Sequence, residues 1–308
     1  MTTTSNSTAQ SERQMSGPGS VGLRFRSILV ATDCSPASAT AVKMAARLAK
    51  EFHAKLYVLH AVMPELYGVG MPGPVPELAP VDLQVSGENL HKYAEHIAEL
   101  RTVAHKEIVF LGSPGDGIRS AGESHDIDLL VLGSHGREGL AKLTLGSVAE
   151  WAIGRLHYPV MVAGPMCDKT FRPIRSIVLG TDLTEQALRP AQYAACIAKD
   201  YQARLTIVNV LPAASTAKQE AGWELTTIKT LRHLMPGDCE DWCTLKFDVR
   251  TGEIAPAILQ SARENKANLI VLGARHKAPL ADHMPRTKLS AIIREAHCPV
   301  LLVPAHSS

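Results

Sequence analysis

The chain has 308 residues, about twice the length of a typical single domain, so its length favours two domains. Its 32 Lys and Arg residues nearly balance 30 Asp and Glu residues, which argues against a general surface for nucleic acid or anionic membranes. No run approaches 18 consecutive apolar residues and the N-terminus lacks a signal pattern, so we expect no membrane segment. Six irregularly spaced cysteines indicate reduced thiols and a cytoplasmic location.

The first elements follow a tail over residues 1–23, whose first 20 residues hold nine Ser or Thr and no apolar periodicity. The apolar run 27–31 predicts a buried parallel strand that stops at Thr32-Asp33. Apolar residues at helical spacing then predict a helix, with Ser35 or Ser38 as its N-cap. A second strand at 55–61 completes a right-handed βαβ unit.

The rest of the first half continues the alternation of helices and strands. Five prolines between Pro64 and Pro80 predict a long surface loop. The expected helices then cover 84–103, 114–124 and 145–156, and the expected strands cover 106–111, 128–133 and 159–162. This order is typical of an open α/β fold with a parallel sheet.

The same order begins again after residue 172, which indicates an internal repeat. Thr32-Asp33 is matched by Thr181-Asp182 at an offset of 149 residues. Val131-Leu132-Gly133 is matched by Val271-Leu272-Gly273 at an offset of 140 residues. The chain is therefore one α/β unit written twice, and we call residues 24–165 the first half and residues 172–305 the second half.

A glycine-rich segment after the fourth strand of the first half predicts a phosphate-binding loop. Gly133 and Gly136 are separated by two residues, and nine more residues precede Gly146-Ser147. Glycines at the carboxyl end of a strand let the backbone approach an anion closely. Gly146-Ser147 opens a predicted helix, whose free N–H groups favour phosphate. Asp33 lies at the same edge of the sheet and could meet the sugar or base of a nucleotide.

This loop spacing resembles the nucleotide-binding motif of the universal stress protein family. Thr32-Asp33, His60-Ala61 and the strand beginning at Tyr158-Pro159-Val160 resemble that family too. The resemblance implies a tandem universal stress protein of the α/β class, with two open parallel five-stranded sheets and helices on both faces (Rossmann-type, adenine-nucleotide hydrolase-like). It implies domains over 24–165 and 172–305, of which the first binds a nucleotide.

The resemblance also implies a cofactor and its site: ATP, with or without magnesium. Carried over to the matching positions, the site consists of Asp33, Ala61, Leu132, Gly133, Gly136, Gly146, Ser147 and Val148. Asp33 and the backbone of Ala61 would bind adenosine, while the glycines and Ser147 would bind ribose and phosphates. The resemblance assigns no catalytic and no metal-ligating residue.

The second half departs from the loop pattern. Gly273 is kept, but His276 stands where the first half has Gly136, and Arg286-Thr287 replaces Gly146-Ser147. Side chains at these points would obstruct a phosphate, so we expect a degenerate second loop, although Asp182 and Val210 keep the adenosine side. Cys239 and Cys243 lack the second ligand pair that a zinc site needs, and they are interpreted as ordinary thiols.

Three functions remain open at this stage. The first is a cytoplasmic stress-response protein that binds ATP and acts through signalling or protection. The second is a slow ATP hydrolase, for which no convincing general base is found. The third is a ligand-free structural dimer. In the family the final strands pair antiparallel, so the resemblance implies an internal pseudo-dimer, with further self-association into a homodimer, and no nucleic-acid or membrane partner.

Overall fold

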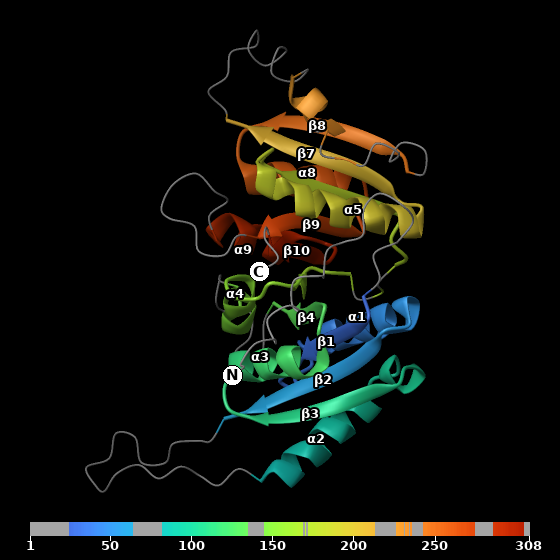
Figure 1. The fold of residues 1–308 in the computed structure, drawn as a ribbon, viewed down its shortest axis with the longest axis vertical. Coiled ribbons are helices and arrows are strands. Elements are labelled where there is room, and N and C mark those ends of the chain that lie inside the picture. Colours follow the sequence, from blue (N-terminus) through green and yellow to red (C-terminus); the bar gives the residue numbers. More distant parts are fainter. Residues whose placement is uncertain are drawn as a thin grey trace, which may run out of the picture.

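The fold was analysed in a computed structural model of the whole chain (Figure 1). The residues that it describes are 25–63, 82–134, 145–168, 170, 172–212, 226–230, 232–233, 235, 243–274 and 286–304. Five features of the sequence analysis fall outside these residues: the tail over 1–23, the proline-rich loop, Gly136, Cys239 and His276.

The first half forms a parallel five-stranded sheet with the strand order β3-β2-β1-β4-β5. Its elements are β1 (Ser27–Ala31), α1 (Ala39–Phe52), β2 (Lys55–Val62), α2 (Leu83–Glu95), the 3₁₀ helix η1 (Leu100–Thr102), β3 (His105–Leu111), α3 (Pro114–His125), β4 (Leu129–Gly133), α4 (Ser147–Ile153) and β5 (Val160–Ala163). The order is that of an open α/β sheet in which the strand order reverses between β1 and β4.

The second half repeats this arrangement with the strand order β8-β7-β6-β9-β10. Its elements are β6 (Ser176–Thr181), the 3₁₀ helix η2 (Glu185–Ala187), α5 (Leu188–Tyr201), β7 (Arg204–Leu211), β8 (Leu245–Thr251), α8 (Ile254–Glu264), β9 (Leu269–Ala274), α9 (Arg286–Glu295) and β10 (Val300–Pro304). The predicted duplication and α/β fold are confirmed.

The two sheets join edge to edge into one ten-stranded sheet. β5 and β10 pair antiparallel, with Met161 opposite Leu301, so the expected internal pseudo-dimer is confirmed (Figure 1). This pairing occupies the two edges that the resemblance assigned to self-association. A homodimer would therefore have to use another surface, since a paired strand has no open edge to offer.

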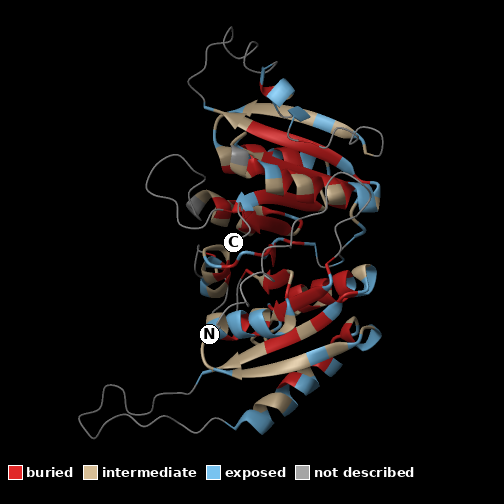
Figure 2. Cartoon of the chain, in the orientation of Figure 1, coloured by how far each residue is buried: buried red, intermediate tan, exposed pale blue. Residues whose placement is uncertain are grey.

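The sheet is buried on both faces, as its continuous apolar strands predict. Ile28 and Val30 face the side covered by α1, α2 and α5, while Leu29 faces the side covered by α3, α4, α8 and α9. Each side holds one hydrophobic cluster that contains residues of both halves. Figure 2 shows the buried residues running through the inner strands, while the outer strands β3 and β8 are largely half-buried.

Two predicted helices are shorter than expected. The helix predicted over 84–103 ends at Glu95, after which the Ile97 N–H donates to the Ala94 carbonyl at 3.0 Å, three residues back, and the chain turns into η1. The Nε of Arg101 donates to the Glu95 carbonyl at 2.7 Å. The helix predicted over 145–156 covers only Ser147–Ile153. Among the described residues, no helix combines the length and apolar character required to cross a membrane.

Candidate functional site

The carboxyl ends of β1 and β4 form the point where the strand order of the first half reverses. β1 lies between β2 and β4, and Val30 of β1 is paired with Val131 of β4. Asp33 follows β1, and Gly133 ends β4, so both lie at this reversal point. Ligands of open α/β sheets bind in the crevice at such a point.

A tight turn after β1 orients Asp33. Its Oδ1 accepts a hydrogen bond from the backbone N–H of Ser35 at 3.0 Å, and Cys34 has a left-handed φ of 60°. The N–H of Cys34 donates to the Thr32 hydroxyl at 3.0 Å. The half-buried Asp33 carboxylate is thereby held by its own turn at the edge of the sheet.

Thr32, Ser38 and Tyr93 form a polar cluster next to this turn, which was not predicted from the sequence. The hydroxyls of Thr32 and Ser38 lie 2.7 Å apart, and the Tyr93 hydroxyl lies 3.3 Å from Ser38. Burial raises the pKa of Tyr93, while its hydrogen bonds to Ser38 and Thr32 act in the opposite direction. Ser38 precedes α1 as expected for an N-cap, but its side chain makes no capping bond because it is used in this cluster.

His60 completes the support of the turn. Its Nδ1 lies 2.9 Å from the Thr32 carbonyl, and since a carbonyl only accepts, Nδ1 carries the proton. In the second half, the Nδ2 of Asn209 donates to the Thr181 carbonyl at 2.9 Å, from the position 149 residues later. A polar residue at the same place in both apolar strands is the sequence signal that could have identified this contact.

Ala61 presents backbone groups beyond the end of β1. The register between β1 and β2 ends with Ala31 opposite Leu59, and the Leu59 carbonyl accepts from Thr32 N–H at 2.9 Å. Successive residues of a strand point their backbone groups to alternate sides, so Ala61 faces the same side as Leu59. Its N–H and carbonyl therefore face the space next to the Asp33 turn.

A backbone hydrogen bond joins the two ends of the loop between β4 and α4; we call this contact between Ser134 and Gly146 the neck of the loop. Gly146 N–H donates to the Ser134 carbonyl at 2.9 Å, and Ser134 N–H donates to the Ala163 carbonyl at 3.0 Å. A Cβ added at Gly146 would lie 2.7 Å from the Ser134 carbonyl oxygen. Any side chain at position 146 would force the two ends of the loop apart.

The remaining predicted residues lie on both sides of this neck. Leu132 is buried in the core on the α3 and α4 side, so only its backbone can reach a ligand. Ser147 is the exposed first residue of α4, and Val148 packs against the same core. The structure brings Gly133, Gly146 and Ser147 together at the end of β4, while Gly136 lies outside the described residues.

The second half has a turn like that of Asp33, but it has no glycine at the position of Gly146. Asp182 accepts hydrogen bonds from the N–H and hydroxyl of Thr184 at 3.1 and 2.7 Å, and Leu183 has a φ of 61°. Gly273 lies near the end of β9, but α9 begins at Arg286 where α4 is preceded by Gly146. At the described start of the last helix, the two halves thus differ in having Gly146 before α4 and Arg286 at the matching position of α9.

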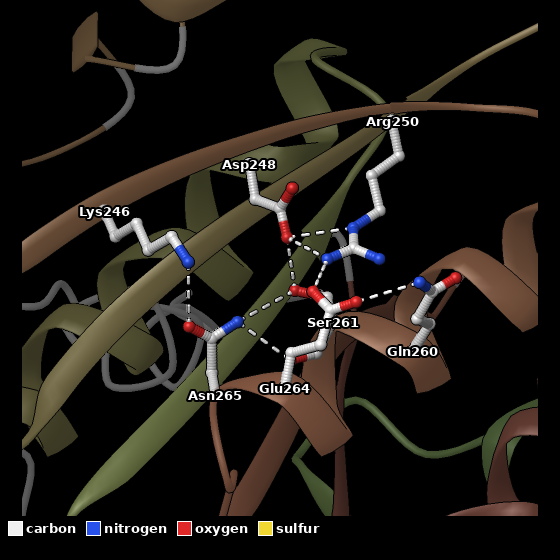
Figure 3. Close-up of polar contacts among 7 residues, drawn as sticks. All are labelled: Lys246, Asp248, Arg250, Gln260, Ser261, Glu264 and Asn265. Carbon is white, nitrogen blue, oxygen red and sulfur yellow. Dashed lines mark hydrogen bonds and ion pairs between the residues drawn. The ribbon is translucent and has the colours of Figure 1, made fainter.

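A second difference is a polar cluster between β8 and α8, shown in Figure 3. Arg250 donates from Nε to Oδ2 of Asp248 at 2.9 Å and also forms an ion pair with Glu264. The buried Ser261 hydroxyl donates to the same Asp248 oxygen at 2.6 Å. Hydrogen bonds from Arg250 and then from Gln260 lower the pKa of Glu264. The charges compensate one another within the cluster, which indicates a structural contact between strand and helix.

No metal centre emerges elsewhere: within the part of the chain that is described, no group of three or more His, Cys, Asp or Glu residues is arranged to hold a metal ion. Cys243 is a half-buried free thiol, as are Cys34 and Cys196, and the free thiols of Cys167 and Cys298 are buried. The arrangement at the end of β1 and β4 can therefore bind a ligand through one carboxylate and several backbone groups.

Comparisons with known proteins agree with this geometry. The model of the universal stress protein family matches residues 24–164 and 173–304. A universal stress protein of Methanocaldococcus jannaschii is 34% identical over 139 residues, which are 45% of this chain and 81% of that protein. A universal stress protein of Bacillus subtilis is 31% identical over 148 residues, covering 45% of this chain and 98% of that protein. The crystal structure of a universal stress protein from Archaeoglobus fulgidus has the same fold, with a TM-score of 0.65 and 17% identity over 92% of this chain and 100% of that chain.

Proposed function

The chain belongs to the universal stress protein family, a family of stress-response proteins, and from this premise we propose that its first half binds ATP. The observation that carries the proposal is the convergence at the sheet reversal point. There the Asp33 carboxylate, the backbone of Ala61 and the glycine neck at Gly146 surround the carboxyl ends of β1 and β4. A carboxylate can accept hydrogen bonds from the hydroxyl groups of a nucleotide, and backbone groups can bind its base and phosphates.

The fit of a nucleotide can be argued from the neck itself. The 2.7 Å approach that a Cβ at Gly146 would make to the Ser134 carbonyl shows that the backbone there has no room for a side chain. The Gly146 N–H is already bonded to the Ser134 carbonyl, so the N–H groups that would meet an anion are those of the first turn of α4, from Ser147 onward. When bound with ATP, magnesium would add positive charge at the phosphates, and the residues assigned here are those that hold the nucleotide.

The two halves would then have unequal roles, and we propose domains over 24–165 and 172–305. The second half keeps the Asp182 turn but has Arg286 in place of Gly146, so its loop would exclude a nucleotide held in the same way. The first domain binds and the second completes the sheet. ATP occupancy would be coupled to signalling or protection under stress.

The duplication supplies a matched pair of variants for the test. Asp33→Ala removes the carboxylate of the first half, and Asp182→Ala removes its counterpart in the second half. Titration of the full chain with ATP, with and without magnesium, should give one site per chain. We expect Asp33→Ala to weaken ATP binding by about tenfold or more, the effect of one hydrogen bond to a charged group, and Asp182→Ala to leave it unchanged.

Each outcome has a definite meaning. Two equivalents of ATP per chain, one of them lost in Asp182→Ala, would contradict the degenerate second half. Equal affinity of the Asp33→Ala variant would overturn the site, and absence of any nucleotide binding would favour a structural role. Steady phosphate release above that of the Asp33→Ala variant would show that the protein hydrolyses ATP.

A further inference from the structure

A pocket of about 520 Å³ lies where α1 of the first half meets the second half. Its apolar wall includes Met44 and Leu48 of α1, Met161 of β5 and Ile174, which leads into β6. We call it the interface pocket. None of the described nucleotide-site residues lines it. Its volume lies within the roughly 300–1,000 Å³ that small-molecule sites have.

The duplication relates the interface pocket to a second position between the halves, and aromatic rings fill that position. Met44 corresponds to Tyr193 of α5, and Ile174 corresponds to Phe25, both at the 149-residue offset. Phe25 and Tyr193 are buried, and their ring centroids lie 6.5 Å apart. The Arg189 guanidinium carbon lies 5.7 Å from the centre of the Tyr193 ring.

The surroundings of these counterparts confirm the correspondence. Asn268 and His297 line the interface pocket, and their counterparts at the 140-residue offset are Asp128 and His157. The Asp128 charge acts on Tyr193, and Arg189 donates to the His157 carbonyl at 3.3 Å. The interface pocket therefore exists because two aromatic side chains on one side of the molecule are replaced by methionine and isoleucine on the other.

The walls of the pocket suit a flexible apolar chain. Met44 and Met161 are buried, whereas Met166 is 54% exposed and stands at the opening. Methionine side chains are unbranched and polarizable, so they adapt to ligands of irregular shape. A rigid planar ligand would gain less from such walls than an alkyl chain.

The residues that line the pocket carry one more positive than negative charge, since Arg47, Arg172 and Lys266 stand against Glu51 and Asp168. Arg172 pairs with Asp168 at 3.5 Å, and Arg47 pairs with Glu99 at 3.5 Å. Lys266 and His297 line the same pocket, and neither has an ion pair among the described residues. A carboxylate at the opening would complete the charge balance of Lys266 without entering the apolar interior.

We infer that the interface pocket binds a medium-chain alkyl carboxylate, with its chain between Met44 and Met161 and its head group at Lys266. Such a ligand would contact α1, the segment leading into β6 and the start of β10 together. Its binding would therefore stabilise the junction between the halves by mass action, separately from nucleotide binding. The inference does not depend on the proposed ATP site.

The test uses the full chain labelled with ¹³C at the methionine methyl groups and titrated with decanoate. The signals of Met44 and Met161 should shift in a saturable way, while that of Met63, which does not line the pocket, should stay in place. Met44→Tyr, which copies Tyr193, should abolish binding, whereas Met44→Leu should keep it. Lys266→Asn should weaken binding about tenfold, and Asn tolerates the left-handed φ of 50° at this position.

Several results would overturn the inference. These are the absence of saturable shifts with decanoate, undiminished binding by Met44→Tyr, or equal affinity for the uncharged 1-decanol. Met166→Trp provides a second block if Met44→Tyr fails to fold, because the exposed Met166 can be enlarged without disturbing the core. Urea unfolding of each variant separates loss of binding from loss of the fold.

Discussion

Gly146 shows how one missing side chain shapes the candidate site. Its φ of −59° and ψ of 142° suit any residue, so backbone conformation does not explain the glycine. The explanation is steric, because a Cβ would lie 2.7 Å from the Ser134 carbonyl oxygen. The glycine is therefore needed for the two ends of the loop to approach each other.

The Gly146→Ala variant tests this at the scale of the residue. We expect its free energy of unfolding to fall by about 1–3 kcal/mol, because the backbone must shift to accept the methyl group. Gly87→Ala is the control: Gly87 lies within α2 with nothing within 4 Å of an added Cβ, so this change should stabilise by about 0.5–1 kcal/mol. Urea unfolding of both variants measures the difference, and a Gly146→Ala protein as stable as the parent would refute the steric argument.

At the scale of secondary structure, the sequence predicted the strands better than the helix ends. Buried parallel strands such as β1 and β4 are continuous apolar runs, and their limits at Thr32 and Ser134 are visible in the residue pattern. At the end of α2, the Ile97 N–H bonds to the Ala94 carbonyl and Arg101 donates to the Glu95 carbonyl, contacts that apolar periodicity does not encode. The backbone groups left unpaired at a helix end are satisfied by such contacts.

The candidate site follows the same rule. Asp33 and the loop glycines could be predicted because turns and close backbone approach restrict the residue types allowed. The contacts of Thr32, Ser38 and Tyr93 next to the turn could not, because they join residues from the end of β1, the start of α1 and α2 that come together only in the folded protein. The interface pocket could not be predicted either, because it depends on Met44 and Ile174, which are distant in the sequence and meet only in the folded protein.

The Asp248–Arg250 ion pair of β8, whose members also contact Ser261 and Glu264 of α8, gives a prediction at this scale. The first half has Ile108 and Phe110 at the matching positions, so apolar packing can replace the ion pair. Asp248→Ala should cost about 2 kcal/mol, less than the roughly 3–5 kcal/mol for a fully buried pair, because both side chains are about 15% exposed (16% and 14%).

The control for this prediction copies the first half. Asp248→Ile combined with Arg250→Phe, Ala257→Gly and Ser261→Ala recreates the packing of Phe110 against Gly117 and leaves no buried hydroxyl without its acceptor. We expect this fourfold variant to unfold within about 1 kcal/mol of the parent, since apolar residues of suitable volume replace ion pairs at little cost. Thermal and urea unfolding measure both variants. A tolerated Asp248→Ala change would show that the ion pair contributes nothing to the stability of the second half.

At the scale of the whole molecule, the two halves form a single folded body with shared cores. Both hydrophobic clusters contain residues from each half, and the β5–β10 pair joins the sheets. Polar contacts add to this junction: Asp168 N–H donates to the His297 carbonyl at 2.9 Å, and Arg189 donates to the His157 carbonyl at 3.3 Å. We therefore expect the parent protein to unfold in one cooperative transition.

Gly164 is the position at which this coupling can be broken with one methyl group. A Cβ there would lie 2.0 Å from the Ile293 carbonyl oxygen of α9, closer than any adjustment of a side chain could relieve. In Gly164→Ala the backbone after β5 must move away from α9, which weakens the junction while leaving the interior of each sheet intact. Urea unfolding should then show two transitions in place of one, whereas the exposed neighbour Pro165→Ala should keep the single transition. A single transition in Gly164→Ala with an unchanged midpoint would mean that the halves are held together without this contact. Two transitions in the parent protein would mean that the shared clusters do not couple them.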